Sequence, residues 1–241
     1  MLMMVPCASL YDHFKKRILA QQRLHIQLQE CIRKNAANTL SMANMLMGLS
    51  SILCILKGHH YFASWLLLIG YLLDLADGAV ARQLNACSSL GAKLDDFADF
   101  TTFGIASALL LPIHSVLDGL LVICYIMTVF TRLCFFSSGI PFMYRGLPCA
   151  YASVILACTN LLSRGNLLIL QLTAILMVLL MVDKGLYPHD KILESQSWKK
   201  LVYAGGIVMI LCSSVPSACV YYLVWSASYI LFPAALWSYK D

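Results

Sequence analysis

Long apolar runs constrain the fold of this chain more than any other feature of its sequence. Hydrophobic residues make up 60% of the sequence and charged residues only 12%, whereas soluble domains carry about 25% charged residues. Windows of about 20 apolar residues are long enough to cross a bilayer as helices. Backbone groups in lipid must be satisfied within their own segment, and the alternating pattern of a membrane barrel is absent. The sequence therefore predicts an all-α, polytopic integral membrane protein.

We predict a core of six membrane helices followed by about two more near the C-terminus. The last apolar run, residues 201–237, is too long for one crossing, and Pro216 divides it. The first half of that run is short, so a re-entrant helix is the alternative there. The predicted spans are residues 38–56, 61–82, 94–113, 117–136, 147–163, 166–182, 201–214 and 217–236.

The predicted spans divide the chain into three regions. Residues 35–182 form the membrane core, and residues 183–241 form a hydrophilic cytoplasmic loop, to residue 200, and a membrane hairpin. In residues 1–34, apolar side chains alternate with basic ones, and no apolar signal-peptide core follows a basic start. This pattern favours an amphipathic helix on the cytoplasmic membrane surface, with a soluble tail as the alternative.

The distribution of lysines and arginines predicts the orientation. With a cytoplasmic N-terminus and eight spans, only Lys57 and Arg164 of the seventeen lysines and arginines lie on the outer side. The net charge of +5 is thus explained by topology. Because the basic residues are spread over several loops without interleaved aromatic residues, we predict no nucleic-acid partner. In a eukaryote, the absence of a visible cleavable targeting segment favours the endoplasmic reticulum membrane.

Acidic residues are concentrated between Asp74 and Asp99. This segment holds five of the twelve carboxylates of the chain. The spacing places small residues, acids and one base on single faces of two helices joined by a polar turn at residues 85–89. The first face carries Asp74, Asp77, Gly78, Ala81 and Arg82, and the second carries Gly91, Asp95 and Asp99. We predict that the two faces turn toward each other at the cytoplasmic side.

Several carboxylates in a membrane segment need water or cations nearby, because each costs about 2.5 to 3.5 kcal/mol at the centre of a span. Arg82 supplies one positive charge, which does not balance them. Clustered hard oxygen ligands suit Mg²⁺, Mn²⁺ or Ca²⁺, and Mg²⁺ commonly binds together with substrate phosphates. The cluster therefore favours phosphate chemistry at a metal centre over an interfacial loop whose acids merely face water.

The acidic stretch resembles the signature of the CDP-alcohol phosphatidyltransferase family. The pattern D-x2-D-G-x2-A-R-x8-G-x3-D-x3-D is complete from Asp74 to Asp99. Upstream, a polar stripe at three- and four-residue steps is similar to the first helix of the phosphatidylserine synthase branch. That stripe consists of Asn38, Ser41, Asn44 and Gly48, with Ala37 at the branch's proline position.

Two further stretches resemble the same branch, which typically shows R-L-A-R-F-N followed by G-L-P-x-P. Arg132, Leu133 and Phe136 match the first motif, and residues 146–148 match the second. In these two stretches Phe135 stands for the second arginine, Ser137 for the asparagine and Ala150 for the second proline.

The resemblance implies transfer of a phosphatidyl group from CDP-diacylglycerol to a small alcohol, with release of CMP, in phospholipid biosynthesis. Serine is the acceptor we favour; inositol and glycerol phosphate are alternatives. Because Phe135 cannot pair with an anion, a silent lipid-binding or scaffold paralogue is a further alternative. An ion channel or transporter is disfavoured, because the remaining spans lack ionisable residues along a path.

The resemblance also implies roles for individual residues. Asp99 would be the general base, and two ions of Mg²⁺ or Mn²⁺ would be held by Asp74, Asp77, Asp95 and Asp99. The nucleotide would contact Asp74, Gly78, Ala81, Arg82 and Gly91, and the acceptor or lipid phosphate would contact Asn44, Arg132 and Arg145. Asp96 lies about 100° away from the Asp95 and Asp99 face and is left out of the site. Related enzymes imply a homodimer formed through the membrane helices.

Overall fold

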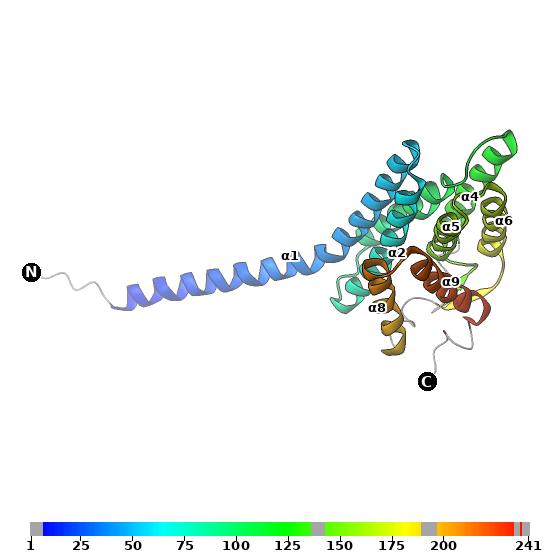
Figure 1. Cartoon of the computed structure of the whole chain (residues 1–241). Coiled ribbons are helices and arrows are strands. Elements are labelled where there is room, and N and C mark those ends of the chain that lie inside the picture. Colours follow the sequence, from blue (N-terminus) through cyan, green and yellow to red (C-terminus); the bar gives the residue numbers. More distant parts are fainter. Residues whose placement is uncertain (1–6, 136–142, 189–196, 234–236, 238–241) are drawn as a thin grey trace, which may run out of the picture.

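The computed structural model describes residues 7–135, 143–188, 197–233 and 237. In these residues the fold is almost entirely helical, as predicted (Figure 1). The elements are α1 (Cys7–Leu56), α2 (His60–Gln83), α3 (Ser89–Asp99), the π-helix η1 (Phe100–Ala106), α4 (Val116–Phe135), β1 (Met143–Arg145), α5 (Cys149–Ser163), α6 (Leu167–Val182), β2 (Leu186–Pro188), α8 (Ser197–Cys212) and α9 (Val215–Leu231).

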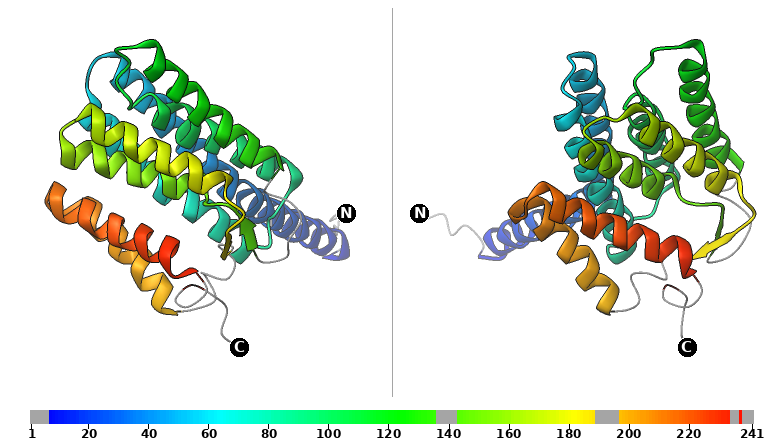
Figure 2. Two further views of the ribbon diagram at one scale, coloured as in Figure 1. Left: turned by 90° about the vertical axis from the view of Figure 1, so that its right-hand side faces the viewer. Right: turned by 45° about the vertical axis from the view of Figure 1, so that its right-hand side comes forward.

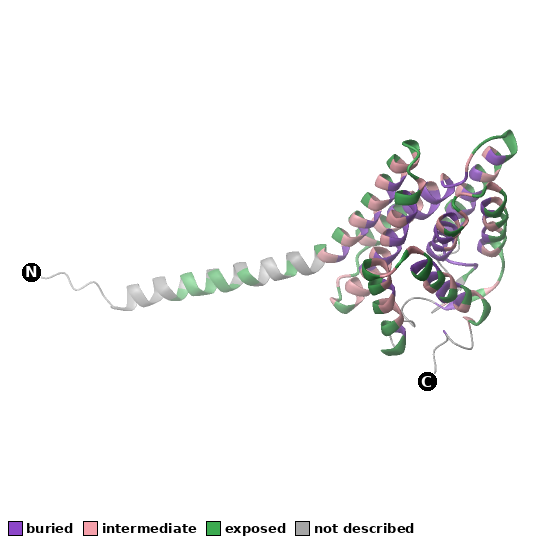
Figure 3. Cartoon of the chain, viewed as in Figure 1, coloured by how far each residue is buried: buried purple, intermediate pink, exposed green. Residues whose placement is uncertain are grey.

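Several of these helices are suited to a membrane. Among the described residues, three helical segments are long and apolar enough to cross a bilayer, namely residues 35–56 of α1, α2 and α4. Three shorter apolar helices, α5, α6 and α9, accompany them. Large apolar side chains on the outer faces of these helices remain exposed, as expected of surfaces that contact lipid (Figure 3).

The first helix differs from the prediction of a separate N-terminal segment. α1 is one continuous helix of 50 residues, so no helix end marks the predicted boundary after residue 34. Its N-terminal part projects away from the bundle, whereas residues from about 35 onward pack along α2 (Figures 1 and 2). Attachment of the projecting part to a membrane surface stays a prediction.

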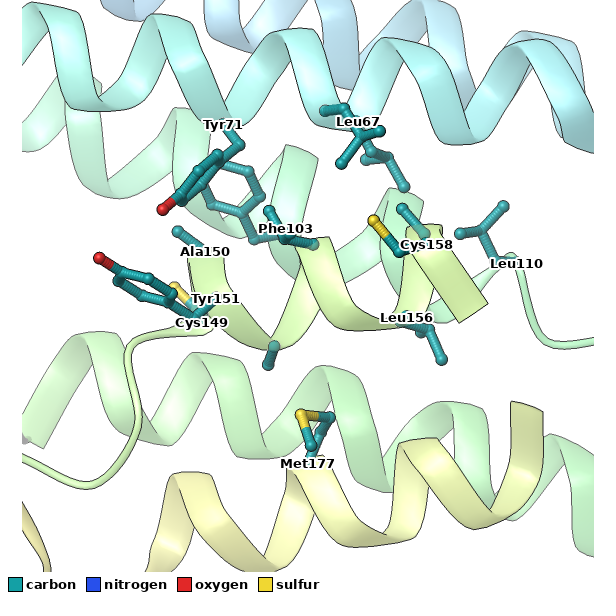
Figure 4. Close-up of a cluster of buried hydrophobic side chains, with 14 of the residues drawn as sticks. Leu67, Tyr71, Phe103, Leu110, Cys149, Ala150, Tyr151, Leu156, Cys158 and Met177 are labelled. Atoms are coloured by element: carbon teal, nitrogen blue, oxygen red, sulfur yellow. The ribbon is translucent and has the colours of Figure 1, made fainter. Parts of the chain in front are cut away.

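Helix α2 lies against several other helices and is tied to them by polar side chains. Ser51 Oγ of α1 donates to the carbonyl of Ala63 at 3.0 Å. Asn160 Nδ2 of α5 donates to Ser64 Oγ at 2.8 Å. Figure 4 shows the buried cluster in which α5 lies between α2 and α6. The cluster fixes residues 63–72 of α2, directly before the acidic residues, against α5.

The C-terminal helices form the predicted hairpin. Pro216 lies in the first turn of α9, so the break in the last apolar run is where the sequence places it. Tyr221 and Tyr222 of α9 donate through their hydroxyls to the carbonyls of Val202 and Gly206 in α8, at 2.6 and 2.9 Å. Tyr229 of α9 stacks on Tyr151 of α5 with ring centroids 4.1 Å apart. The hairpin is therefore packed onto the core by aromatic contacts.

The predicted loop at residues 183–200 is wrong in two respects. β2 pairs antiparallel with β1, so a small two-stranded sheet joins the segments that follow α4 and α6. In addition, α8 begins at Ser197, where Lys199 is buried and donates to the carbonyl of Trp237 at 2.9 Å. Strands of three residues are too short to show the alternating pattern by which a strand is recognised in a sequence.

Close contacts between η1 and α1 hold the end of α3 in place. α3 continues directly into the π-helix η1, and Thr102 Oγ1 of η1 donates to the carbonyl of Asn44 in α1 at 3.1 Å. Gly48 makes this approach possible, because a Cβ at Gly48 would lie 2.8 Å from the Cα of Thr102. The contact holds η1, and with it the end of α3, against α1.

We expect Gly48→Ala to destabilise the protein. In a helix interior alanine is ordinarily favoured over glycine by about 1 kcal/mol, but overpacking against Thr102 costs about 1 to 3 kcal/mol. Thermal unfolding in detergent should show a lower midpoint than in the wild type. Gly119→Ala in α4 is the matched control, because its Cβ would meet nothing closer than Ile113 at 4.0 Å. Equal midpoints for the two variants would contradict the close contact.

Candidate active site

The two acidic helices meet through a capped turn. α2 ends at Gln83 and α3 begins at Ser89, which confirms the predicted polar turn between them. Asn85 adopts the left-handed conformation (φ 49°), which asparagine tolerates better than most residues. Ser88 caps α3, because its Oγ accepts from the backbone N–H of Gly91 at 3.0 Å. The chain therefore reverses and brings the acidic face of α3 beside that of α2.

Three carboxylates come together where these faces meet. Asp74 of α2 and Asp95 and Asp99 of α3 each offer an oxygen, and these oxygens lie within 4.8 Å of one another. Like charges at that separation repel by roughly 3 kcal/mol per pair at an effective dielectric constant of about 20. The cluster therefore needs bound protons or a cation to be stable.

The donor set fits a divalent cation. All three ligands are carboxylate oxygens, which hard cations such as Mg²⁺ and Mn²⁺ prefer. Asp99 Oδ1 is buried, and it has no hydrogen-bond partner in the part of the chain that the structure describes. A buried carboxylate oxygen of this kind is costly unless a ligand or ion meets it. The acidic group formed by Asp74, Asp95 and Asp99 could thus bind a metal ion.

A cavity of about 320 Å³ opens beside the cluster. It lies between the first part of the α1 span, the C-terminal half of α2 and the start of α3. Asp77 lines it as well, although it does not belong to the group of three carboxylates. The lining residues include Asn38, Ser41, Asp74, Asp77, Gly78, Ala81, Arg82, Ser88, Gly91, Asp95 and Asp99.

The glycines and the alanine of the motif keep this cavity open. A Cβ at Gly78 would lie 2.9 Å from Arg82 Nη2, so glycine lets the guanidinium fold back over the helix. A Cβ at Gly91 would lie 2.9 Å from Asn38 Oδ1, so glycine admits the polar stripe of α1. Every residue predicted to contact the nucleotide therefore lines one cavity, with Arg82 as its cation.

Three predicted residues do not line the cavity. Asn44 is fully buried one turn below Ser41, and its side-chain amide has no hydrogen-bond partner among the described residues. Arg132 is buried at the end of α4, and Arg145 is exposed at the end of β1. The predicted acceptor residues thus lie outside the lining of the cavity that the predicted nucleotide residues share.

Cys149 is a residue that the sequence analysis missed. Arg132 Nη1 donates to Cys149 Sγ at 3.4 Å, and that thiol lies 4.0 Å from Asp99 Oδ2, to which it donates. Cys149 is 1% exposed and begins α5 (Figure 4). Arg132 therefore reaches the carboxylate cluster through a thiol. Cys149 occupies the variable position x of G-L-P-x-P, directly after the matched residues 146–148. That position is the sequence signal that could have identified it.

The three departures in the R-L-A-R-F-N and G-L-P-x-P stretches have different surroundings. Phe135 is 72% exposed at the last residue of α4, so an apolar ring occupies the surface where the branch carries a cation. Ala150 is buried in the first turn of α5. Ser137 lies outside the described residues. Asp96 is exposed and lies outside the cavity lining, as predicted.

The carboxylate group of three and the apolar helices around it fit a known family of membrane proteins. The sequence profile described as CDP-alcohol phosphatidyltransferase matches residues 34–236, which is most of the chain. The chain belongs to the CDP-alcohol phosphatidyltransferase family.

Curated relatives agree with this assignment. The chain is 48% identical to Transmembrane protein 269 of Mus musculus over 91% of this chain and 87% of that protein. It is 52% identical to Transmembrane protein 269 of Homo sapiens over 80% of this chain and 95% of that protein. It is also 32% identical to the CDP-diacylglycerol–serine O-phosphatidyltransferase of Bacillus subtilis, over 66% of this chain and 96% of that protein. The likeness to the serine enzymes is thus more distant.

We expect Asp95→Asn to weaken metal binding by about tenfold or more, because it removes one charged ligand from the group of three. Titration of the purified protein with Mn²⁺, followed by the electron paramagnetic resonance signal of the free ion, measures this directly and needs no turnover. Asp96→Asn is the matched control, since Asp96 is the exposed neighbour on the same helix. Unchanged Mn²⁺ affinity in Asp95→Asn would remove the cluster from this role.

Proposed function

We propose that the protein transfers a phosphatidyl group from CDP-diacylglycerol to a small alcohol and releases CMP. The proposal is based mainly on one observation: the three carboxylates of Asp74, Asp95 and Asp99 line a cavity that Arg82 also lines. Family membership supports the reaction class, and the serine enzymes among the relatives make serine the acceptor we favour. Inositol and glycerol phosphate are the alternative acceptors.

The reaction needs neutralisation of phosphate charge and removal of one proton. Two divalent ions, Mg²⁺ or Mn²⁺, would neutralise the pyrophosphate and the leaving CMP. The residues that would hold them are Asp74, Asp77, Asp95 and Asp99. Arg82 supplies a planar cation that suits a phosphate. Gly78, Ala81 and Gly91 leave room for the nucleotide. The acceptor oxygen forms a bond to the phosphorus nearest the lipid as the bond to CMP breaks.

Asp99 is the residue we assign as general base. It sits one turn beyond Asp95, at the junction of α3 and η1, and π-helices are common at functional sites. The thiol of Cys149 contacts Asp99 Oδ2, which leaves Oδ1 to accept the proton of the acceptor hydroxyl. The carboxylate is held in place by its helix on one side and by Cys149 on the other.

The acceptor side is assigned to Asn44, Arg132 and Arg145. Arg132 points to the cluster through Cys149 and provides a buried positive charge near Asp99. Asn44 offers a buried amide with no internal partner in the described chain. Arg145, exposed beside the sheet, suits the phosphate of a membrane lipid.

The remaining parts of the proposal concern the setting of the enzyme. The charge distribution supports an active site that faces the cytoplasm, and in a eukaryote the endoplasmic reticulum membrane. A homodimer through the membrane helices is proposed from the resemblance to related enzymes alone, because exposed apolar side chains are equally expected at a lipid surface. The product would enter phospholipid biosynthesis.

One observation favours a second candidate, a silent paralogue that binds CDP-diacylglycerol or serves as a scaffold. Phe135 places an exposed ring at the position where the serine branch carries a cation. A phenyl ring makes no charge-assisted hydrogen bond to a phosphate or to an acceptor carboxylate.

CMP release tests the proposal. Purified protein with CDP-diacylglycerol and Mn²⁺ should release CMP only when serine, inositol or glycerol phosphate is added, and the productive acceptor identifies the substrate. Asp99→Asn should lower this rate by about a hundredfold or more, because a base contributes about 10² to 10⁴. Asp96→Asn should retain the wild-type rate.

The outcomes separate the two candidates. Acceptor-dependent release that Asp99→Asn abolishes would establish the transferase. Tight CDP-diacylglycerol binding without release under any acceptor would establish the silent paralogue. Normal turnover in Asp99→Asn would remove that residue from the base role.

We also expect Phe135→Arg to raise the use of serine, because it restores a cation at the end of α4. The readout is the KM for serine in the CMP assay, which should fall while kcat changes little. Thr131→Arg is the control, since Thr131 is exposed on the same helix one turn before Phe135. Identical serine kinetics in Phe135→Arg and the wild type would contradict a role for this position.

A further inference from the structure

A second cavity, of about 500 Å³, lies at the other end of the bundle. It is bounded by the turn between α1 and α2, the segment after η1, and the turn between α5 and α6. His60, at the first residue of α2, lies roughly 20 Å along the helix axis from Asp74, because a helix rises about 1.5 Å per residue. The cavity thus opens at the membrane face opposite the carboxylates.

Arg164 is the fixed positive charge of this cavity. It caps α5 in the left-handed conformation (φ 53°, ψ 40°), where glycine or asparagine is usual. Gly165, which follows it, is also left-handed, so the chain turns sharply there. In the described part of the protein, Arg164 has no side-chain hydrogen bond or ion pair. The turn therefore presents a guanidinium that no carboxylate neutralises.

Other groups around the cavity also favour an anion. His59 and His60 line it, and none of its lining residues is acidic. His59 caps α2 without a side-chain hydrogen bond, so the first-turn amides of a 24-residue helix face this end. Asn160 is buried and donates to Ser64 Oγ and to the carbonyl of His60, which holds the cavity wall rigid.

The rim of the cavity is suited to hydrocarbon. Tyr61 and Phe62 line it and are 49% and 58% exposed, and their rings meet edge to face with centroids 5.5 Å apart. Aromatic side chains of this kind gather at the headgroup level of membranes. A charged pocket next to such a rim matches a molecule with a phosphate and acyl chains.

We propose that this cavity binds the phosphate of an anionic phospholipid in the leaflet opposite the acidic site, with Arg164 as the phosphate ligand. The acyl chains lie along Phe62 and the adjoining apolar surface. A water-soluble phosphate ester shares the same headgroup chemistry and is distinguished from the lipid by the test. The inference does not depend on transferase activity.

Lipid titration of the full-length protein tests this. Purified protein in a neutral detergent is titrated with phosphatidylglycerol, and bound lipids are counted by native mass spectrometry, with phosphatidylcholine as the uncharged comparison. Arg164→Asn should weaken phosphatidylglycerol binding by about tenfold or more, because it removes charge-assisted contacts. Asparagine accepts the left-handed backbone, so the turn is kept. Phosphatidylcholine binding should not change.

Lys57→Asn is the matched control. Lys57 is an exposed lysine in the turn between α1 and α2, close to the cavity in sequence but not part of its lining. It should change the affinity by less than about twofold, because Lys57, unlike the equally exposed Arg164, does not line the cavity. Equal losses in Lys57→Asn and Arg164→Asn would overturn the proposal in favour of general surface charge. Displacement of the lipid by millimolar glycerol phosphate would overturn the lipid assignment in favour of a soluble phosphate ester.

A third variant keeps the proposal falsifiable if Arg164→Asn does not fold. Arg164→Lys retains the charge but loses the planar fork that pairs with two phosphate oxygens. Its affinity for phosphatidylglycerol should fall severalfold below that of the wild type. Wild-type affinity in Arg164→Lys would show that the guanidinium does not bind the phosphate.

Discussion

The repulsion among Asp74, Asp95 and Asp99 is the constraint on which the rest of the site depends. Three carboxylate oxygens within 4.8 Å are held together by the covalent turn, the cap at Ser88 and the packing of η1 behind α3. These supports are built from small residues and backbone hydrogen bonds, which resist separation without adding opposite charge. The protein therefore preserves a strongly negative point that a cation stabilises.

Several helices of the bundle place residues around the three carboxylates. α1 contributes the polar wall at Asn38 and Ser41, and α5 contributes Cys149, which links Asp99 to Arg132. The aromatic contacts of α9 press α5 against the core. In this way α1 packs on α3 and α5 packs on α2, the two helices that carry the carboxylates.

The sequence predicts the acidic site well because its information is local. The spacing from Asp74 to Asp99 is set by the helical period and by one short turn, and the structure places the whole motif around a single cavity. The hairpin at Pro216 is predicted for the same reason, since proline acts on its own helix. A cytoplasmic orientation and the identity of a bound metal ion stay predictions.

What the sequence does not reveal depends on contacts between distant segments. Cys149 follows Asp99 by 50 residues in the chain. Its thiol lies near Asp99 because α5 packs on η1. The close approach of the π-helix to α1 at Thr102 and Gly48 also joins segments more than 50 residues apart. The pairing of β1 with β2 likewise joins segments about 40 residues apart, and three-residue strands carry too little alternation to be recognised.

The unbroken helix α1 has a mechanical consequence. Residues 7–34 form a lever of roughly 40 Å at 1.5 Å per residue, and the same helix carries Asn38 and Ser41 into the wall of the acidic cavity. One continuous helix therefore joins the projecting part to the wall of the cavity, and its direction changes where it meets the bundle (Figure 1). If the projecting part lies on a membrane surface, as the sequence predicts, that surface and the wall of the cavity are joined by a single helix.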